Sequence, residues 1–239
     1  MPTVDDLKIK IFADGADLQG IAKLAKNPLI QGFTTNPTLM AKANGSMVYE
    51  DFAREVLEAV DGKQVSFEVF SDEFDDMERQ ARLISGWAEN VYTKVPVTNT
   101  RGESSSELIR KLASDGVMLN VTALMTPAQA AEVGACLKDG PPAIVSVFAG
   151  RVADTGRDPV PLMTEALEAL KPYPNVELLW ASPREILNIV QADEVGCHII
   201  TVTHDVLAKL PTLGKDLDEF SLDTVKMFHE SAQTAAFEL

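Results

Sequence analysis

The sequence predicts a single α/β domain with the (β/α)8 barrel fold, the TIM barrel, and three observations lead to this prediction. Eight short apolar, strand-like runs occur along the 239 residues. Their starts are 22 to 33 residues apart, which leaves room for a crossover helix between successive parallel strands. No Pro/Gly/Ser-rich linker divides the chain, so residues 1–239 are expected to form one barrel domain that ends in a C-terminal helical extension.

Each strand is expected where a short run of apolar and β-branched residues stands between polar stretches. The eight runs are IKIFAD (9–14), GFTTN (32–36), VSFEVF (65–70), VYTKVPV (91–97), VMLNVTA (117–123), AIVSVFA (143–149), VELLWAS (176–182) and HIITVT (198–203). An open, doubly wound sheet is the alternative, but it normally carries a glycine-rich phosphate turn after its first strand. The segment FADGADLQG (12–20) matches neither the dinucleotide fingerprint nor the P-loop, which favours the barrel.

Two of the intervening segments show clear helical signals. Within residues 73–89, one face of a helix would carry Phe74, Met77, Ala81 and Ile84. The segment TPAQAAEVGACL (126–137) begins with a capping-box sequence, Thr126-Pro-Ala-Gln129, with proline at the first helical position.

A final amphipathic helix is expected over residues 222–237. Its apolar stripe needs a partner, so we expect it to cover a barrel end or a neighbouring subunit, the latter in a homo-oligomer.

Composition narrows the function classes. The formal net charge of −15 argues against binding of nucleic acid or an anionic membrane, since both need a basic surface. No run approaches the roughly 18 apolar residues of a membrane span, and the N-terminus lacks the features of a secretory signal. Cys136 and Cys197 cannot form a disulfide framework, which favours the cytoplasm. An anionic small molecule would need locally concentrated positive charge.

Lys94 and Glu68 lie inside apolar runs of neighbouring strands, and lysine is rarely buried unless it is paired or used. One interpretation is a structural ion pair in the barrel. The other is chemical: a desolvated lysine has a lowered pKa and offers a neutral amine that forms a Schiff base with a carbonyl. Cleavage of a carbon–carbon bond would then need acid/base groups nearby, for which Asp14 and Glu68 are the candidates.

Other polar residues stand late in the expected strands, where barrel enzymes hold their active sites. Each also has a structural interpretation: Asp14 before Gly15 turns the chain, Asn36 before Pro37 caps a helix, and strand-end hydroxyls satisfy backbone groups. The further candidates are Thr35, Asn120, Thr122, Ser146 and Ser182.

Arg151 and Arg184 are expected at the same barrel end. In ASPREI (181–186), Ser182 as N-cap, Pro183 at the first helical position and Glu185 as capping-box partner predict a helix that begins at Pro183. A cation such as Arg184 in the first turn opposes the helix dipole unless an anion is bound there. Two arginines at one helix N-terminus therefore predict a phosphate site.

The histidines and cysteines show no metal-ligand spacing, so no metal is assigned.

Seven motifs, in order over residues 12–186, resemble those of the transaldolase family, which includes the fructose-6-phosphate aldolases. They are FADGADL (12–18), GFTTNPTLM (32–40), SFEVF (66–70), YTKVPVT (92–98), LNVTALMTPAQA (119–130), SVFAGRVAD (146–154) and ASPREI (181–186).

The resemblance implies class I chemistry without metal or organic cofactor. A dihydroxyacetone unit would move from a ketose phosphate (sedoheptulose 7-phosphate or fructose 6-phosphate) to an aldose phosphate, as in the pentose phosphate pathway. Lys94 would form the Schiff base, Asp14 would deprotonate the donor's C4 hydroxyl, and Glu68 with Thr122 would hold a proton-shuttling water. The remaining residues would bind substrate: Asn36, Asn120 and Ser146 the dihydroxyacetone unit with Thr35 in support, and Arg151, Ser182 and Arg184 the phosphate.

Three alternatives stay open. Aldolases of the fructose-6-phosphate type, which release free dihydroxyacetone, tend to carry Gln at the Glu68 position and Tyr at the Phe148 position, so both residues here favour a transaldolase. Pro183 stands where related enzymes often carry a bulkier or more flexible residue, and it leaves the exact anionic group open. A substrate with a sulfonate in place of the phosphate is a further alternative, because Arg and Ser accept either anion. A catalytically silent binding barrel is disfavoured, since none of the reactive residues is missing.

Overall fold

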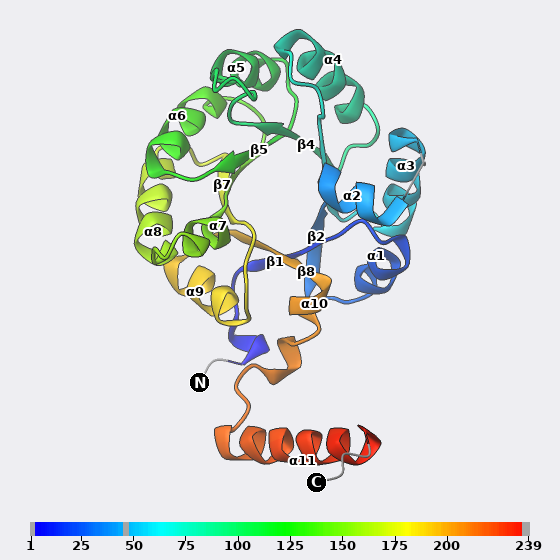
Figure 1. Cartoon of the computed structure of the whole chain (residues 1–239). Helices are drawn as coiled ribbons and strands as arrows, with labels where there is room; N and C mark the ends of the chain where they lie inside the picture. Colours follow the sequence, from blue (N-terminus) through cyan, green and yellow to red (C-terminus); the bar gives the residue numbers. More distant parts are fainter. Residues whose placement is uncertain (1–2, 45–47, 236–239) are drawn as a thin grey trace.

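Within residues 3–44 and 48–235, which the computed structural model describes, eight parallel strands close into a barrel that helices surround (Figure 1). In chain order the elements are the 3-10 helix η1 (Val4–Asp6), β1 (Lys10–Asp14), α1 (Leu18–Ala25), β2 (Ile30–Thr34), α2 (Pro37–Asn44), α3 (Tyr49–Ala59), β3 (Gln64–Glu68), α4 (Phe74–Ser85), β4 (Val91–Pro96), α5 (Ser106–Ser114), β5 (Leu119–Leu124), α6 (Pro127–Leu137), β6 (Ala143–Val147), α7 (Ala149–Asp154), α8 (Pro159–Leu170), β7 (Val176–Trp180), α9 (Leu187–Val195), β8 (Ile199–Thr203), α10 (His204–Leu207), the 3-10 helix η2 (Leu210–Thr212) and α11 (Leu217–Ala235).

The predicted barrel is confirmed. Each strand pairs in parallel with the next one along the chain, and β8 pairs with β1 to close the ring. The expected strands are all present, although β2 begins two residues before the GFTTN run. The helices return the chain to the opposite end after each strand, so all strand C-termini meet at one end of the barrel.

Two apolar layers hold the barrel together. The larger one lies between the sheet and the surrounding helices, and it takes residues such as Ile11 and Ala13 from alternate positions of β1. The intervening residue, Phe12, belongs to a smaller cluster inside the barrel with Ile144, Leu179, Ala181 and Ile199. Gly32 makes room for this cluster, because a Cβ atom there would lie 2.6 Å from the Phe12 ring.

The two helices with clear sequence signals form as expected. In α4 the side chains of Met77, Ala81 and Ile84 are buried. In α6 the Thr126 hydroxyl accepts a hydrogen bond from the Gln129 N–H, and the capping box is complete.

The predicted helix start at Pro183 is wrong, because α9 begins at Leu187. Ser182 has φ +63°, a left-handed conformation that an N-cap does not adopt. The side chain that caps this turn is Asn188, whose Oδ1 accepts from the N–H groups of Arg184 at 2.7 Å and Glu185 at 3.2 Å. Arg184 therefore lies before the helix rather than in its first turn.

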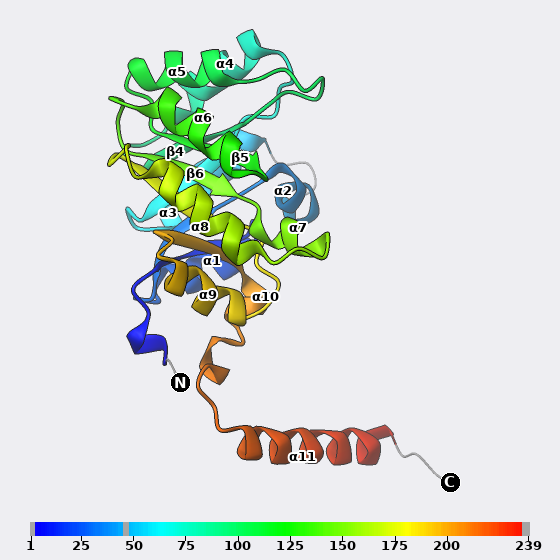
Figure 2. The same cartoon turned by 90° about the vertical axis from the view of Figure 1, so that its left-hand side faces the viewer.

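The C-terminal helix α11 begins at Leu217, five residues earlier than expected, and the expected end at Phe237 lies outside the described residues. It lies clear of the barrel in both side and end views (Figures 1 and 2), and none of its described residues is buried. The expectation that it covers an end of its own barrel is wrong. Six large apolar side chains are exposed on it: Leu217, Phe220, Leu222, Val225, Met227 and Phe228.

Among the described helices, none is both long enough and apolar enough to cross a membrane.

Candidate active site

A cavity of about 610 Å³ opens at the end of the barrel where the strands finish. Residues in or directly after all eight strands contribute to its wall. Eleven of the twelve candidate residues from the sequence line it: Asp14, Asn36, Glu68, Lys94, Asn120, Thr122, Ser146, Phe148, Arg151, Ser182 and Arg184.

Lys94 lies in the wall of this cavity with its amine held from two sides. Its Nζ is 3.0 Å from Oε2 of Glu68. It also donates a hydrogen bond to the backbone carbonyl of Thr35 at 3.0 Å. The Lys94 side chain is 7% exposed and that of Glu68 is 18% exposed, so both charges are largely removed from water.

Strand register explains why these side chains meet. Glu68 of β3 is opposite Lys94 of β4, and Lys94 is opposite Asn120 of β5. Side chains at matching positions of neighbouring strands point to the same face of the sheet. All three therefore enter the barrel at one level.

Asp14 enters the cavity from β1. The Thr34 hydroxyl lies 2.8 Å from Asp14 Oδ1, to which it donates, and 2.5 Å from the Thr201 hydroxyl. Burial raises the pKa of Asp14 above its ordinary value, although Lys94 and the Thr34 hydrogen bond oppose the shift. A carboxylate with a raised pKa accepts a proton from a substrate hydroxyl more readily than an ordinary one.

Asn120 and Ser146 form a fixed polar chain beside the amine. The Ser146 hydroxyl donates to Asn120 Oδ1 at 2.7 Å, and Asn120 Nδ2 donates to the Ser66 hydroxyl at 3.1 Å. All three side chains are buried, so their orientations are set by one another.

Thr122 follows on β5, where the pairing with β6 is irregular between Val121 and Leu124. Ala123 there has φ +66°, a conformation that costs an ordinary residue about 1 kcal/mol or more. The Thr122 hydroxyl is buried and makes no hydrogen bond to the described part of the chain. The residue lines the cavity.

Arg151 and Arg184 bring positive charge to one side of the cavity, where Ser182 also lies. Arg184 makes a paired salt bridge to Asp154, and the Arg151 guanidinium lies 5.5 Å from the centre of the Phe148 ring. The segment after β6 and the segment after β7 approach each other closely because residue 150 is glycine. A Cβ atom at Gly150 would lie 1.5 Å from the Ser182 carbonyl oxygen.

Thr35 is the one candidate whose side chain does not line the cavity. Its hydroxyl donates to the Ser66 carbonyl at 3.0 Å, while its own carbonyl accepts from Lys94. Asn36 combines both interpretations made from the sequence: it lines the cavity, and its Oδ1 accepts from the Leu39 N–H at the start of α2.

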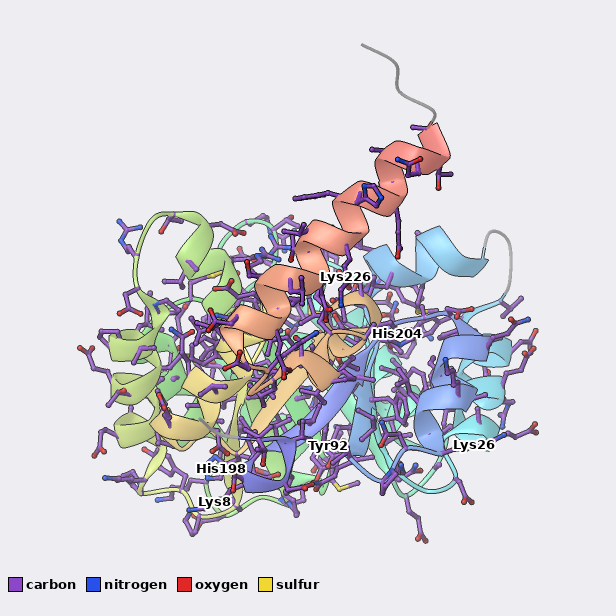
Figure 3. The ribbon with its side chains drawn as sticks, turned by 90° about the horizontal axis from the view of Figure 1, so that it is seen from below. Lys8, Lys26, Tyr92, His198, His204 and Lys226 are labelled. Atoms are coloured by element: carbon purple, nitrogen blue, oxygen red, sulfur yellow. The ribbon has the colours of Figure 1, made fainter. Side chains whose placement is uncertain are left out.

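Several residues near the site were not among the twelve candidates from the sequence. Thr34 and Thr201 could have been found from the two-residue alternation of their strands. Tyr49 gives no local signal, since the site residue that it contacts, Glu68, is 19 residues away in the sequence. His204 lies towards the α2 end of the barrel, opposite Tyr92 and His198 (Figure 3), and its charged form would lower the pKa of Asp14.

No group of three or more His, Cys, Asp or Glu side chains suitable for a metal ion occurs within residues 3–44 and 48–235.

The family model for transaldolase and fructose-6-phosphate aldolase matches residues 11–239. The chain belongs to this family. This match confirms the resemblance found in the sequence and covers almost the whole chain. It supports an enzyme with aldolase or transaldolase activity.

Relatives within the transaldolase/fructose-6-phosphate aldolase family match along nearly their full lengths. A probable transaldolase of Nitrosopumilus maritimus is 33% identical over 231 residues, covering 93% of this chain and 98% of that protein. Probable transaldolase 2 of Listeria monocytogenes is 33% identical and covers 90% and 95%. A probable transaldolase of Rhodospirillum centenum is 34% identical and covers 91% and 92%.

Solved structures support the fold alone. A putative phosphonomutase from Burkholderia cenocepacia aligns with a TM-score of 0.60 at 14% identity, covering 94% of both chains. Dihydrodipicolinate synthase from Rhodopseudomonas palustris aligns with a TM-score of 0.56 at 17% identity, covering 93% of this chain and 80% of that one.

Proposed function

We propose that the protein is a transaldolase that transfers a dihydroxyacetone unit between sugar phosphates through a Schiff base on Lys94. The observation that carries the proposal is the position of the Lys94 amine. It is buried in the cavity wall, 3.0 Å from the Glu68 carboxylate, with Asp14 and two arginines lining the same cavity. A structural ion pair alone would not need the further acid, amide and cationic groups around it.

In the proposed reaction the neutral Lys94 amine attacks the C2 carbonyl of a ketose phosphate. The carbinolamine then loses water and becomes a protonated Schiff base. Glu68 lies close enough to the amine to exchange protons in these steps. Thr122, whose hydroxyl is otherwise unpartnered among the described residues, would help it to hold the water that carries them.

Asp14 would take the proton of the C4 hydroxyl. The C3–C4 bond then breaks, an aldose phosphate leaves, and the bonding electrons remain on Lys94 as an enamine. The enamine attacks the carbonyl carbon of a second aldose phosphate, Asp14 returns its proton to the new hydroxyl, and water releases the product. The raised pKa of Asp14 suits this reversible proton transfer.

Binding of the substrate follows the polarity of the cavity wall. Asn36, Asn120 and Ser146 would bind the hydroxyls of the dihydroxyacetone unit. Arg151, Ser182 and Arg184 would bind the phosphate. The two arginines give a strongly acidic chain the local positive charge that an anionic substrate needs.

Two residues favour transfer over release of free dihydroxyacetone. Glu68 stands where aldolases of the family tend to carry Gln, and Phe148 stands where they tend to carry Tyr. Phe148 lines the cavity and has no hydroxyl with which to position a hydrolytic water on the enamine.

The test incubates the protein with fructose 6-phosphate, with and without erythrose 4-phosphate. A transaldolase forms glyceraldehyde 3-phosphate at a sustained rate only when erythrose 4-phosphate is present, and it releases little free dihydroxyacetone. Equal rates in both mixtures, with free dihydroxyacetone accumulating, would show the aldolase instead. Turnover of a sulfonated ketose in preference to fructose 6-phosphate and sedoheptulose 7-phosphate would show that the cavity binds a sulfonate rather than a phosphate.

We further propose a homo-oligomer in the cytoplasm. The exposed apolar residues of α11 would be covered by a second copy of the chain.

The cysteines support the cytoplasm, because both are free and buried, as suits a reducing compartment. Burial raises the pKa of the Cys197 thiol to about 12, which keeps it unreactive.

A further inference from the structure

The phenol of Tyr49 makes two hydrogen bonds to the backbone of one residue in the active site. It accepts from the N–H of Glu68 and donates to the carbonyl of the same residue, both at 2.9 Å. Tyr49 is the first residue of α3, and it does not line the cavity.

Strand pairing explains why Glu68 has these groups to offer. Ser66, two residues earlier on β3, bonds towards β2, since its carbonyl accepts from Thr35 N–H at 3.1 Å. Residues two apart on a strand present their backbone groups to the same side, so those of Glu68 also face β2. However, β2 ends at Thr34, and the chain then enters α2 at Pro37, which has no N–H. The phenol thus takes the place of the missing strand.

The surroundings hold the phenol in that place. The Tyr49 ring packs against Phe67 at 6.4 Å, Phe70 at 5.6 Å and Trp87 at 5.6 Å between centroids. Burial raises its pKa, so the hydroxyl stays neutral and can both donate and accept.

We propose that Tyr49 is a positioning residue that holds the end of β3 so that the Glu68 carboxylate stays against the Lys94 amine. This inference rests on the proposed function, in which Glu68 exchanges protons with Lys94. Glu68 is the last residue of β3, and without the phenol its backbone would have no partner on the β2 side within the described chain. A small rotation there would move the carboxylate from its 3.0 Å contact.

The experiment compares four variants of the full chain: Tyr49→Phe, Glu68→Gln, the double variant, and Tyr173→Phe as the control. Tyr49→Phe keeps the ring and its aromatic contacts but removes the hydroxyl. Tyr173 packs on the outside of the barrel, against Gly134 of α6, and serves as a tyrosine remote from the site. Steady-state kinetics are combined with the rate at which borohydride traps a Lys94 adduct, and each thermal midpoint is measured.

Tyr49→Phe is expected to lower kcat and the trapping rate by about tenfold, because small displacements of reacting groups are costly, while KM changes less than about twofold. In the Glu68→Gln background the same change should cost less than about twofold, since the group that Tyr49 positions is already lost. Tyr173→Phe should behave as the original chain does.

An unchanged kcat in Tyr49→Phe, or an undiminished tenfold loss in the Glu68→Gln background, would overturn the inference. Neither result would contradict the proposed function, which Lys94→Met tests separately. If Lys94→Met stays active, the Schiff base itself is misassigned and the role of Tyr49 falls with it.

Discussion

The amine of Lys94 and the carboxylate of Glu68 lie 3.0 Å apart on neighbouring strands, and both are largely buried. A buried ion pair contributes little net stability, because removal of two charges from water offsets their attraction. The same geometry suits the proposed reaction, in which the carboxylate would pass protons to and from the nitrogen. The pair is thus better explained by chemistry than by stability.

Lys94→Met should abolish turnover and covalent trapping while the barrel still folds, since methionine fills much of the same volume without the amine. The measurement adds borohydride with fructose 6-phosphate and locates the adduct by peptide mass. Lys111→Met is the control, because Lys111 makes an exposed salt bridge to Glu78 on the outer helices. An adduct on any other lysine, or appreciable activity of Lys94→Met, would leave the structural ion pair as the better explanation.

Arg184→Ala should raise KM for phosphorylated sugars by about tenfold or more, since a charge-assisted hydrogen bond contributes about 1.5–3 kcal/mol. Little stability should be lost, because the Arg184–Asp154 bridge is about half exposed, at 47% and 53%, and exposed bridges contribute at most about 1 kcal/mol. Arg157→Ala is the control, since Arg157 is exposed and, among the described residues, its side chain bonds to the Thr155 hydroxyl alone. The anion site is misassigned if KM for dihydroxyacetone-based substrates without phosphate rises equally.

Asp14→Asn should lower kcat by about a hundredfold or more while it stabilises the fold at neutral pH. The folded-state pKa of Asp14 is raised by burial, so the stability given by the protonated carboxyl is present below its unfolded value and is lost as pH rises through the folded value. Asparagine resembles the protonated form and does not ionise. Urea unfolding should therefore show a gain over the original chain at pH 8 that shrinks towards pH 4. A gain of equal size at both pH values would argue against a raised pKa of the Asp14 carboxyl in the folded chain.

The barrel could be predicted from the sequence because its signals are local and repeat eight times. Lys94 and Glu68 could also be found, since a charge inside an apolar strand is visible without the fold. Their contact follows from register, which the spacing of residues on neighbouring strands already implies.

The errors arose where a local pattern competes with contacts made later in the fold. Ser182 to Glu185 match a capping box, yet Ser182 adopts a left-handed conformation and its carbonyl lies close to Gly150. Asn188 caps the turn instead. Tyr49 gave no signal for the same reason: its proposed role depends on the early end of β2, which no residue near Tyr49 indicates.

The apolar residues of α11 predict that the chain assembles with a second copy through this helix. Leu217, Phe220, Val225, Met227 and Phe228 are all exposed, and their spacing places them on one broad face of the helix. A face of this kind is covered in stable proteins, and the barrel of the same chain does not cover it.

Phe228→Asp should dissociate the proposed oligomer, since it places a charge in the middle of that face, where burial would be costly. Gln233→Asp adds the same charge on the other side of α11 and should leave assembly unchanged. Light scattering gives the mass of each variant, and the barrel's activity per chain reports whether the site depends on assembly. If the original chain already has the mass of a monomer, or if both variants assemble equally, α11 does not hold subunits together and its apolar face must bind something other than a second copy.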